Sequence, residues 1–273
     1  MKKTQPRAFG YLLEFWYFGL KEARSCIFAG SFFLILAASK ILDTQALFGL
    51  FRYDAILLAT LLLQAVLLLT RVETIDELKV ICIFHVFGFA LEVFKIQPSI
   101  ASWAYPEAGA SKLFGAPLYA GFMYAAVASY MMQAWRLFDL KLIGSPHPWL
   151  SGSLAAAVYL NFFSHHLPGV ADFRWWIAAG LVFAYRHTWV YFTPRNFRLR
   201  MPMVLAFVLI GFFVWVAENM ASFLGAWIYP HQQSGWAMVH FGKFGAWTLL
   251  VVLTFVIVSN AKVARQQSAG ETQ

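Results

Sequence analysis

Charged residues are scarce in this chain, and cysteine is almost absent. Only 12% of the 273 residues are Asp, Glu, Lys or Arg, which is about half the share that is usual in a soluble domain. The two cysteines, Cys26 and Cys82, both lie in apolar runs, so the sequence offers no disulfide framework. These shortages exclude a disordered chain, a disulfide scaffold and an ordinary soluble domain.

The sequence signatures of common soluble enzymes are also absent. There is no phosphate-binding loop, no nucleophile elbow and no dinucleotide fingerprint. No HExxH pair or other closely spaced ligand set is present, so no metal or other cofactor is predicted. The net charge is +8, but the basic residues lie between apolar segments rather than in one patch. This distribution argues against a nucleic-acid partner.

Apolar runs fill most of the chain, which is 60% hydrophobic and 18% aromatic. A membrane-spanning helix needs about 20 mainly apolar residues. Eight runs approach that length: 26–42, 55–70, 80–95, 113–134, 149–163, 175–191, 203–224 and 236–259. Because the backbone must satisfy its own hydrogen bonds in lipid, we predict an all-α, multi-pass membrane bundle of about eight helices. Seven spans and one re-entrant segment are the alternative.

Positive charge is unevenly divided between the two sides of such a bundle. With eight spans, 14 of the 21 lysines and arginines fall on the side that carries both termini, and four fall on the other. Cytoplasmic loops are enriched in Lys and Arg, so we predict an inner-membrane protein with both termini in the cytoplasm. Residues 1–24 are expected to be a cytoplasmic segment with an amphipathic helix, lying on the membrane or against the bundle. The polar residues 262–273 are expected to form a disordered tail.

Several features occur twice in the chain at nearly the same separation. The offsets between their two copies are 122 to 126 residues. They are the Trp-x-Tyr-Pro motifs at 103–106 and 227–230, and the pairs Arg52/Arg174, Gly88/Gly211 and Glu92/Glu218. A duplication explains the shared offset, so we predict two tandem four-helix halves, residues 25–144 and 145–261, related by a pseudo-twofold axis along the membrane normal. An interfacial aromatic belt explains either motif alone.

Ionisable residues inside the predicted spans gather in the outer half of the bundle. Charge is costly in a bilayer, so such residues usually mark function. We predict a polar pocket there, with these candidate catalytic residues: Glu92, Glu218, His85 and His240. The candidate binding residues are Trp103, Tyr105, Trp227, Tyr229, Lys243 and Asn219. In the structural alternative, Glu218 and Lys243 only neutralise each other. A zinc or iron site is a further alternative, with His85, His165, His166, His240 and the two glutamates as candidate ligands.

Parts of the sequence resemble two known protein families. The stretches FGLKEARSCIFAG, FHVFGFALEVFK, SWAYPE and WVAENMASFLGAWIYP resemble a bacterial integral-membrane family catalogued as domain of unknown function 817, which implies an inner-membrane protein. A local stretch from Trp103 to Leu118 is similar to heterodimer-type carotenoid lycopene cyclases, whose paired acids are thought to protonate a polyene. Here Tyr119-Ala120 follow Leu118 in place of those acids. The resemblance therefore leaves Glu92 and Glu218 as the candidate acids.

Three kinds of function are consistent with these features, and the sequence leaves open whether the protein is an enzyme. The first is acid–base chemistry on an isoprenoid or another lipid, with Glu92 or Glu218 as general acid and aromatic rings stabilising positive charge. The second is a small-solute or proton-coupled transporter in which Glu92 titrates. The third is a structural role in the envelope. In each case the lipid bilayer is the expected partner.

Overall fold

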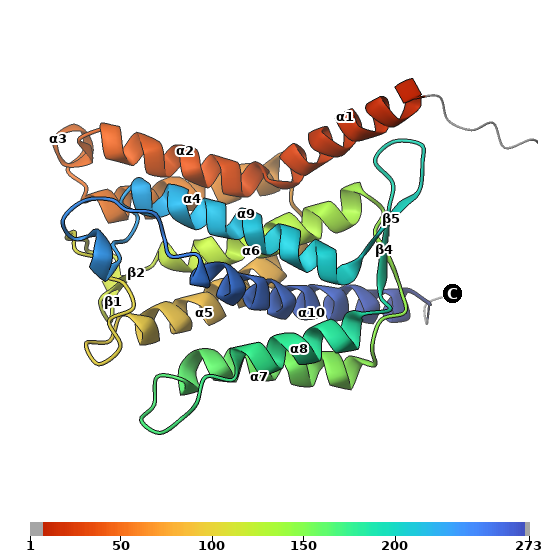
Figure 1. The fold of residues 1–273 in the computed structure, drawn as a ribbon. Coiled ribbons are helices and arrows are strands. Elements are labelled where there is room, and N and C mark those ends of the chain that lie inside the picture. Colours follow the sequence, from red (N-terminus) through yellow and green to blue (C-terminus); the bar gives the residue numbers. More distant parts are fainter. Residues whose placement is uncertain (1–7, 271–273) are drawn as a thin grey trace, which may run out of the picture.

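The computed structural model describes the backbone of residues 8–270 and, within it, the side chains of residues 9–260. The helices run along a common direction and form one bundle (Figure 1). The first six helices are α1 (Ala8–Ser25), α2 (Ile27–Ile41), α3 (Thr44–Phe48), α4 (Arg52–Leu69), α5 (Ile75–Lys95) and α6 (Ala120–Leu137). They are followed by α7 (Pro148–Ser164), α8 (Arg174–Tyr185), α9 (Met203–Phe223), the short η1 (Pro230–Gln232) and α10 (Gly242–Gly270).

The eight predicted apolar runs each contain a helix, but fewer pass a strict test for a membrane span. Of the described helices, α4, α9 and the Gly242–Asn260 part of α10 are long and apolar enough to cross a membrane. Helices α1 and α2, bent by 59° at their junction, make a fourth candidate if they count as one span. Helix α8 has only 12 residues and is therefore about 18 Å long, which is shorter than the hydrocarbon core.

The prediction of an all-α fold is wrong at the end of the bundle where α1 begins and α10 ends (Figure 1). There β3 (Lys141–Ile143), β4 (Trp189–Phe192) and β5 (Leu199–Pro202) form an antiparallel sheet in the order β3-β4-β5. The predicted sixth span, 175–191, overlaps with the first residues of β4. Side chains along β4 alternate between half-buried and buried, and this two-residue period, with aromatic and β-branched residues, favours a strand.

Two other predicted boundaries are also wrong. The run 113–134 begins with a hairpin of β1 (Lys112–Leu113) and β2 (Ala116–Pro117), and its helix starts only at Ala120. The run 236–259 becomes helical only at Gly242. Residues 262–270, expected to be disordered, continue α10, in keeping with the helix-forming Ala, Lys, Arg and Gln in this stretch. The rest of that tail, 271–273, and residues 1–7 lie outside the described part.

Corresponding helices make corresponding contacts in the two parts of the bundle. Helix α5 packs against α6, and α9 packs against α10. Helix α2 contacts α4 and α6, while α7 contacts α8 and α10. Glycine permits the close approach in both packed pairs. A Cβ atom on Gly88 would lie 2.6 Å from Tyr124 Cβ, and one on Gly211 would lie 2.8 Å from Thr248 Cα.

Helix α1 turns its apolar side away from the bundle. Phe9, Phe15 and Trp16 are exposed, whereas Glu14 is buried. The Glu14 carboxylate accepts hydrogen bonds from the backbone N–H groups of residues 195–197, between β4 and β5. The acidic side of this amphipathic helix is therefore its anchor, and the apolar side faces the surroundings.

Candidate functional site

Glu92 is held by three hydrogen-bond donors near the end of α5. The side chain is only 2% exposed. Its Oε2 accepts from the Trp103 indole at 2.7 Å and from the Tyr105 hydroxyl at 2.6 Å, while Oε1 accepts from the Tyr124 hydroxyl at 2.8 Å. Trp103 and Tyr105 belong to the first Trp-x-Tyr-Pro motif, so this loop folds back onto the acid of the preceding helix.

Glu218 has the same relation to the second motif. It lies on α9, is 6% exposed, and accepts a hydrogen bond from the Tyr229 hydroxyl. The Trp227 side chain is a second polar neighbour of this carboxylate. Each predicted acid therefore lies against the tryptophan and the tyrosine of its own motif.

The two motifs also contact each other directly. Ala104 and Ile228, the central residues of the two motifs, form an antiparallel bridge with N–H···O distances of 2.9 and 3.0 Å. The Trp103 and Tyr229 ring centroids are 6.0 Å apart. Reciprocal contact between equivalent residues is the geometry of a local twofold axis. The structure thus brings both acids into one buried cluster.

Lys243, from α10, joins this cluster through aromatic rings. Its Nζ lies 5.0 Å from the ring centroid of Trp103 and 5.0 Å from that of Tyr229, a favourable position for a cation. None of the four ion pairs among the described residues joins Lys243 to Glu218. The Tyr229 phenol instead binds Glu218, and Lys243 lies over the phenol ring. The two charges still interact across this ring.

The two motif tyrosines act as hydrogen-bond donors. Burial, and then the charge of Glu92, raises the pKa of Tyr105 well above its usual value. Burial, and then the charge of Glu218, does the same to the pKa of Tyr229. Both phenols therefore keep their protons at neutral pH, and each can donate to its carboxylate.

A small cavity of about 30 Å³ lies beside the acids, where α5, α6, α7 and α10 meet. It is lined by Leu91, Lys95, Trp103, Tyr124, Phe162, Lys243, Ala246, Trp247 and Leu250. A volume of this size holds about one water-sized molecule. Lys95 Nζ lies 2.6 Å from His166 Nε2. Burial, and then the charge of Lys95, lowers the pKa of His166 to about 4, so the neutral ring can accept a hydrogen bond from Lys95.

Other predicted site residues lie elsewhere or have local roles. His240 is exposed, and its Nδ1 accepts from the Gly242 N–H at 3.0 Å at the start of α10. Asn219 binds the Trp215 carbonyl and the Val239 N–H at 2.8 Å each. His85 packs against Phe122 on the α5–α6 contact, with ring centroids 4.5 Å apart.

The candidate metal ligands are not assembled into a metal centre. His165 stacks on His166 with centroids 3.9 Å apart, but His85 and His240 lie on other parts of the fold. Among the described residues, no three His, Cys, Asp or Glu side chains are grouped so that they could hold a metal ion.

Sequence reasoning missed three residues of this cluster: Tyr124, Lys95 and Trp247. An aromatic residue in an apolar helix has no distinctive sequence signal, and Lys95 stands at a helix end where snorkelling is the ordinary expectation. A usable signal for Tyr124 was its position opposite Gly88, because a small residue in one helix permits a large one to approach from the next.

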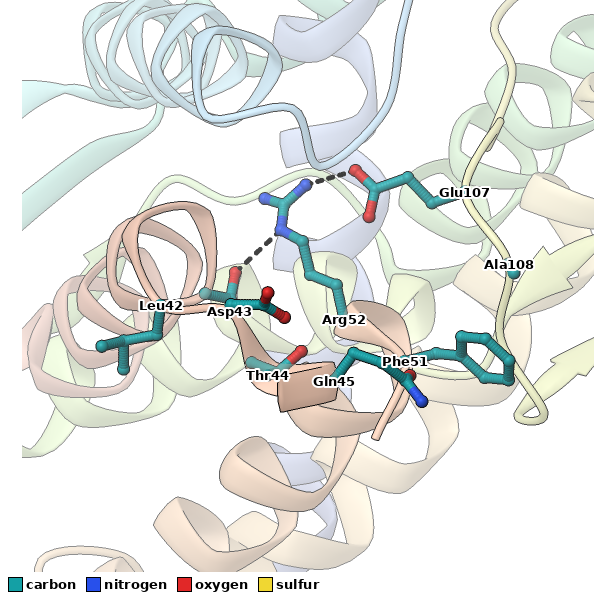
Figure 2. Close-up of a pocket in the computed structure, with 9 residues that line it drawn as sticks. Leu42, Asp43, Thr44, Gln45, Phe51, Arg52, Glu107 and Ala108 are labelled. Atoms are coloured by element: carbon teal, nitrogen blue, oxygen red, sulfur yellow. Dashed lines mark hydrogen bonds and ion pairs between the residues drawn. The ribbon is translucent and has the colours of Figure 1, made fainter. Parts of the chain in front are cut away.

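A larger, open hollow of about 340 Å³ lies at the α3 end of the bundle, and Figure 2 shows Arg52 beside Glu107 in its wall. The Arg52 guanidinium donates to Glu107 at 2.6 Å, to the Leu224 carbonyl at 2.6 Å and to the Gly225 carbonyl at 3.0 Å. A cation at the carboxyl end of a helix is stabilising. Arg52 thus ties α4 to the end of α9, and the hollow marks a junction between helices.

The comparisons with known proteins agree with the first resemblance drawn from the sequence. The family described as "Protein of unknown function (DUF817)" matches residues 14–255. "Uncharacterized protein YoaT" of Bacillus subtilis (strain 168) is 47% identical over 252 residues, which cover 92% of this chain and 93% of that protein. No solved structure matches the chain. The local resemblance to lycopene cyclases is not shown by these matches.

Proposed function

The chain belongs to the DUF817 family, and from that premise we propose that it is a multi-pass inner-membrane transporter that couples a small solute to protons at Glu92 and Glu218. The proposal rests on one observation: Glu92 and Glu218 lie in one buried cluster beside a small cavity. Buried carboxylates in membrane bundles are costly and commonly form proton relays. The aromatic donors keep both acids in place while their protonation changes.

The proposed topology has eight membrane helices with both termini in the cytoplasm. Helix α1 begins and α10 ends at the same end of the bundle (Figure 1), as an even number of crossings requires. That end also carries the β4–β5 connection with Arg195 and Arg198, which favours the cytoplasmic side. The Trp-x-Tyr-Pro loops then belong to the outer side, and the exposed apolar face of α1 belongs against the inner leaflet.

We further propose that the bundle consists of two related halves, α2 to α6 and α7 to α10. The matched helix contacts, the two close-contact glycines and the Ala104–Ile228 bridge support this relation. Halves of this kind commonly place a substrate site at their interface and move about it. The cluster of Glu92, Glu218 and Lys243 draws on both halves, so a rocking motion would expose it to either side.

The experiment is proton movement in proteoliposomes containing a trapped pH-sensitive dye, under an imposed pH gradient and a fixed membrane potential. We expect dye acidification with the wild-type chain and its loss with Glu92→Gln or Glu218→Gln, because glutamine keeps the shape but not the titration. Asp43→Asn is the matched control. It replaces a carboxylate at the same end of the bundle, where Asp43 caps α3, and asparagine caps a helix equally well.

Wild-type flux in both glutamine variants would contradict the proposal, and so would the absence of flux in the wild type. Each variant is first checked for an unchanged unfolding temperature in detergent, so that a lost signal is not a lost fold.

The lipid-modifying function has one observation in its favour. The Trp103 and Tyr229 rings already carry a cation, Lys243, on their faces, and such faces also stabilise a developing carbocation. A cavity of about 30 Å³ does not admit an isoprenoid unless the bundle opens. Lipid extracts from cells with and without the protein test this alternative. A lipid change that disappears with Glu92→Gln would favour chemistry over transport.

A further inference from the structure

The cavity between Lys95 and Lys243 offers hydrogen-bond donors and positive charge. Among its lining residues there is no Asp or Glu. Trp103 and Tyr124 are lining residues whose polar groups donate to Glu92. The other polar groups of the lining are the two ammonium groups and the indole N–H of Trp247. That N–H is buried and has no hydrogen-bond partner among the described residues, so a ligand that accepts hydrogen bonds would satisfy it.

Neither ammonium group has a carboxylate partner at ion-pair distance. The four ion pairs of the described residues include neither Lys95 nor Lys243. Lys95 is 5% exposed, and its ammonium group contacts His166 and the Phe162 ring. Lys243 lies over two aromatic rings. The nearest carboxylates act on these ammonium groups from beyond ion-pair distance. A charge that is shielded from water without a directly bound counter-ion is costly, and an anion between the two lysines would offset that cost.

From this arrangement we propose that the cavity binds one small monovalent anion such as chloride. The second part of the inference is that this anion is the transported solute, and this part rests on the proposed function. The cavity volume of about 30 Å³ limits the size of the ligand, because it holds about one water-sized particle. Chloride, bromide and nitrate are the expected ligands. Sulfate and phosphate are too large and too highly charged for this cavity.

The neighbouring acids couple this anion to a proton. The titratable and charged groups around the cavity are Glu92, Lys95, Tyr105, Tyr124, His165, His166, Asp172, Arg174, Glu218, Tyr229 and Lys243. With both glutamates ionised, their two negative charges balance the two lysines. An added anion leaves one negative charge in excess, and a proton on Glu92 or Glu218 restores the balance. Anion affinity is therefore expected to rise as the pH falls.

The test uses the full chain purified in detergent and compares sodium chloride with sodium gluconate at equal ionic strength. A ligand that binds only the folded state raises the unfolding temperature, so chloride is expected to raise it and gluconate is not. Chloride NMR reports binding independently, through line broadening that bromide reverses and sulfate does not. Both signals are expected to disappear in Lys95→Gln and Lys243→Gln.

Two further variants test whether chloride binds inside this cavity. Trp247→Phe keeps an aromatic side chain but removes the pyrrole part of the indole with its N–H, and is expected to weaken chloride binding about tenfold, as for one hydrogen bond to a charged group. Lys79→Gln removes an exposed cation outside the cavity and is expected to leave binding unchanged. Absence of chloride broadening in the wild type, or equal broadening in Lys243→Gln, overturns the anion site.

The outcomes also separate this inference from the proposed function. If proton flux is the same in chloride and in gluconate and no chloride binds, the anion inference fails while proton transport stands. If chloride binds in the wild type but no proton flux occurs, the transporter proposal fails and the cavity is an anion site of another kind. Flux that needs chloride and that both lysine variants abolish supports the two together.

Discussion

The two proposed halves place corresponding residues in unlike surroundings. In the first half, Glu92 receives three hydrogen bonds, including one from Tyr124 on the next helix. In the second, Glu218 is held only by the side chains of its own motif, Tyr229 and Trp227. The helix packing and the motif contacts of the two proposed halves therefore match, whereas their charge and hydrogen bonding differ.

The clearest difference between the two proposed halves is the presence of Lys243 in the second. Lys243 is the second residue of α10. At the start of α6, the matching helix of the other proposed half, the sequence has Tyr119 and Ala120 and no lysine. One lysine therefore stands beside both motifs, over Trp103 from one half and Tyr229 from the other. A site of this composition exists only where the halves meet, so neither half is expected to carry it alone.

The largest expected effect comes from the paired glycines, whose substitution tests whether the halves pack alike. We expect Gly88→Ala and Gly211→Ala each to lower the unfolding temperature strongly, because overpacking costs about 1–3 kcal/mol or more. The Gly211 variant should be the worse of the two. An added Cβ there meets the Thr248 backbone, whereas at Gly88 it meets the side chain of Tyr124.

Gly30 and Gly152 are the matched controls for these substitutions. They lie in helices α2 and α7, and a Cβ atom at either position would have no neighbouring atom within 4 Å. Alanine at either position is expected to raise helix stability by about 0.5–1 kcal/mol. Unchanged unfolding temperatures for Gly88→Ala and Gly211→Ala would mean that the two helix pairs do not approach as described.

An intermediate effect is expected from the two arginines that occupy equivalent positions. Arg52 binds two carbonyls at the end of α9, whereas Arg174 pairs with the neighbouring Asp172 at 2.5 Å. Arg52→Gln should cost about 1–3 kcal/mol, because it leaves those carbonyls unpaired. Arg174→Gln should cost about 0–1 kcal/mol, as for an exposed pair. Equal losses of unfolding temperature in detergent would show that Arg52 does not tie the two helices together.

The helical part of the fold was predictable because length and apolarity are local properties. The run 203–224 and the helix Met203–Phe223 nearly coincide. The sheet was not predictable from such properties, since Lys141 pairs with Tyr191, which lies two helices further along the chain. Short strands of this kind are stabilised by their partners rather than by their own sequence.

The site was predictable where the repeated sequence features marked it and unpredictable where another helix completed it. The shared offset identified Glu92, Glu218 and both Trp-x-Tyr-Pro motifs. Helical spacing placed His240 beside Lys243, but α10 begins only at Gly242, so His240 precedes the helix and does not share that face. Tyr124 and Trp247 required knowledge of how α6 and α10 are rotated, which periodicity does not provide when a helix is apolar on all sides.

The smallest expected effect concerns the contact of His166 with Lys95, which joins α5 to the loop after α7. The pKa of His166 falls from 6.5 to about 4 in the folded chain through burial and the charge of Lys95. Between these two values the unfolded chain binds the additional proton, so this contribution to stability is complete above pH 6.5 and is lost progressively as the pH falls toward about 4. The unfolding temperature of the wild type should therefore decline across this window, and His166→Gln should decline less steeply. The exposed His187→Gln is the control and should keep the wild-type slope. Identical slopes in all three chains would show that the contact with Lys95 does not depend on a neutral His166.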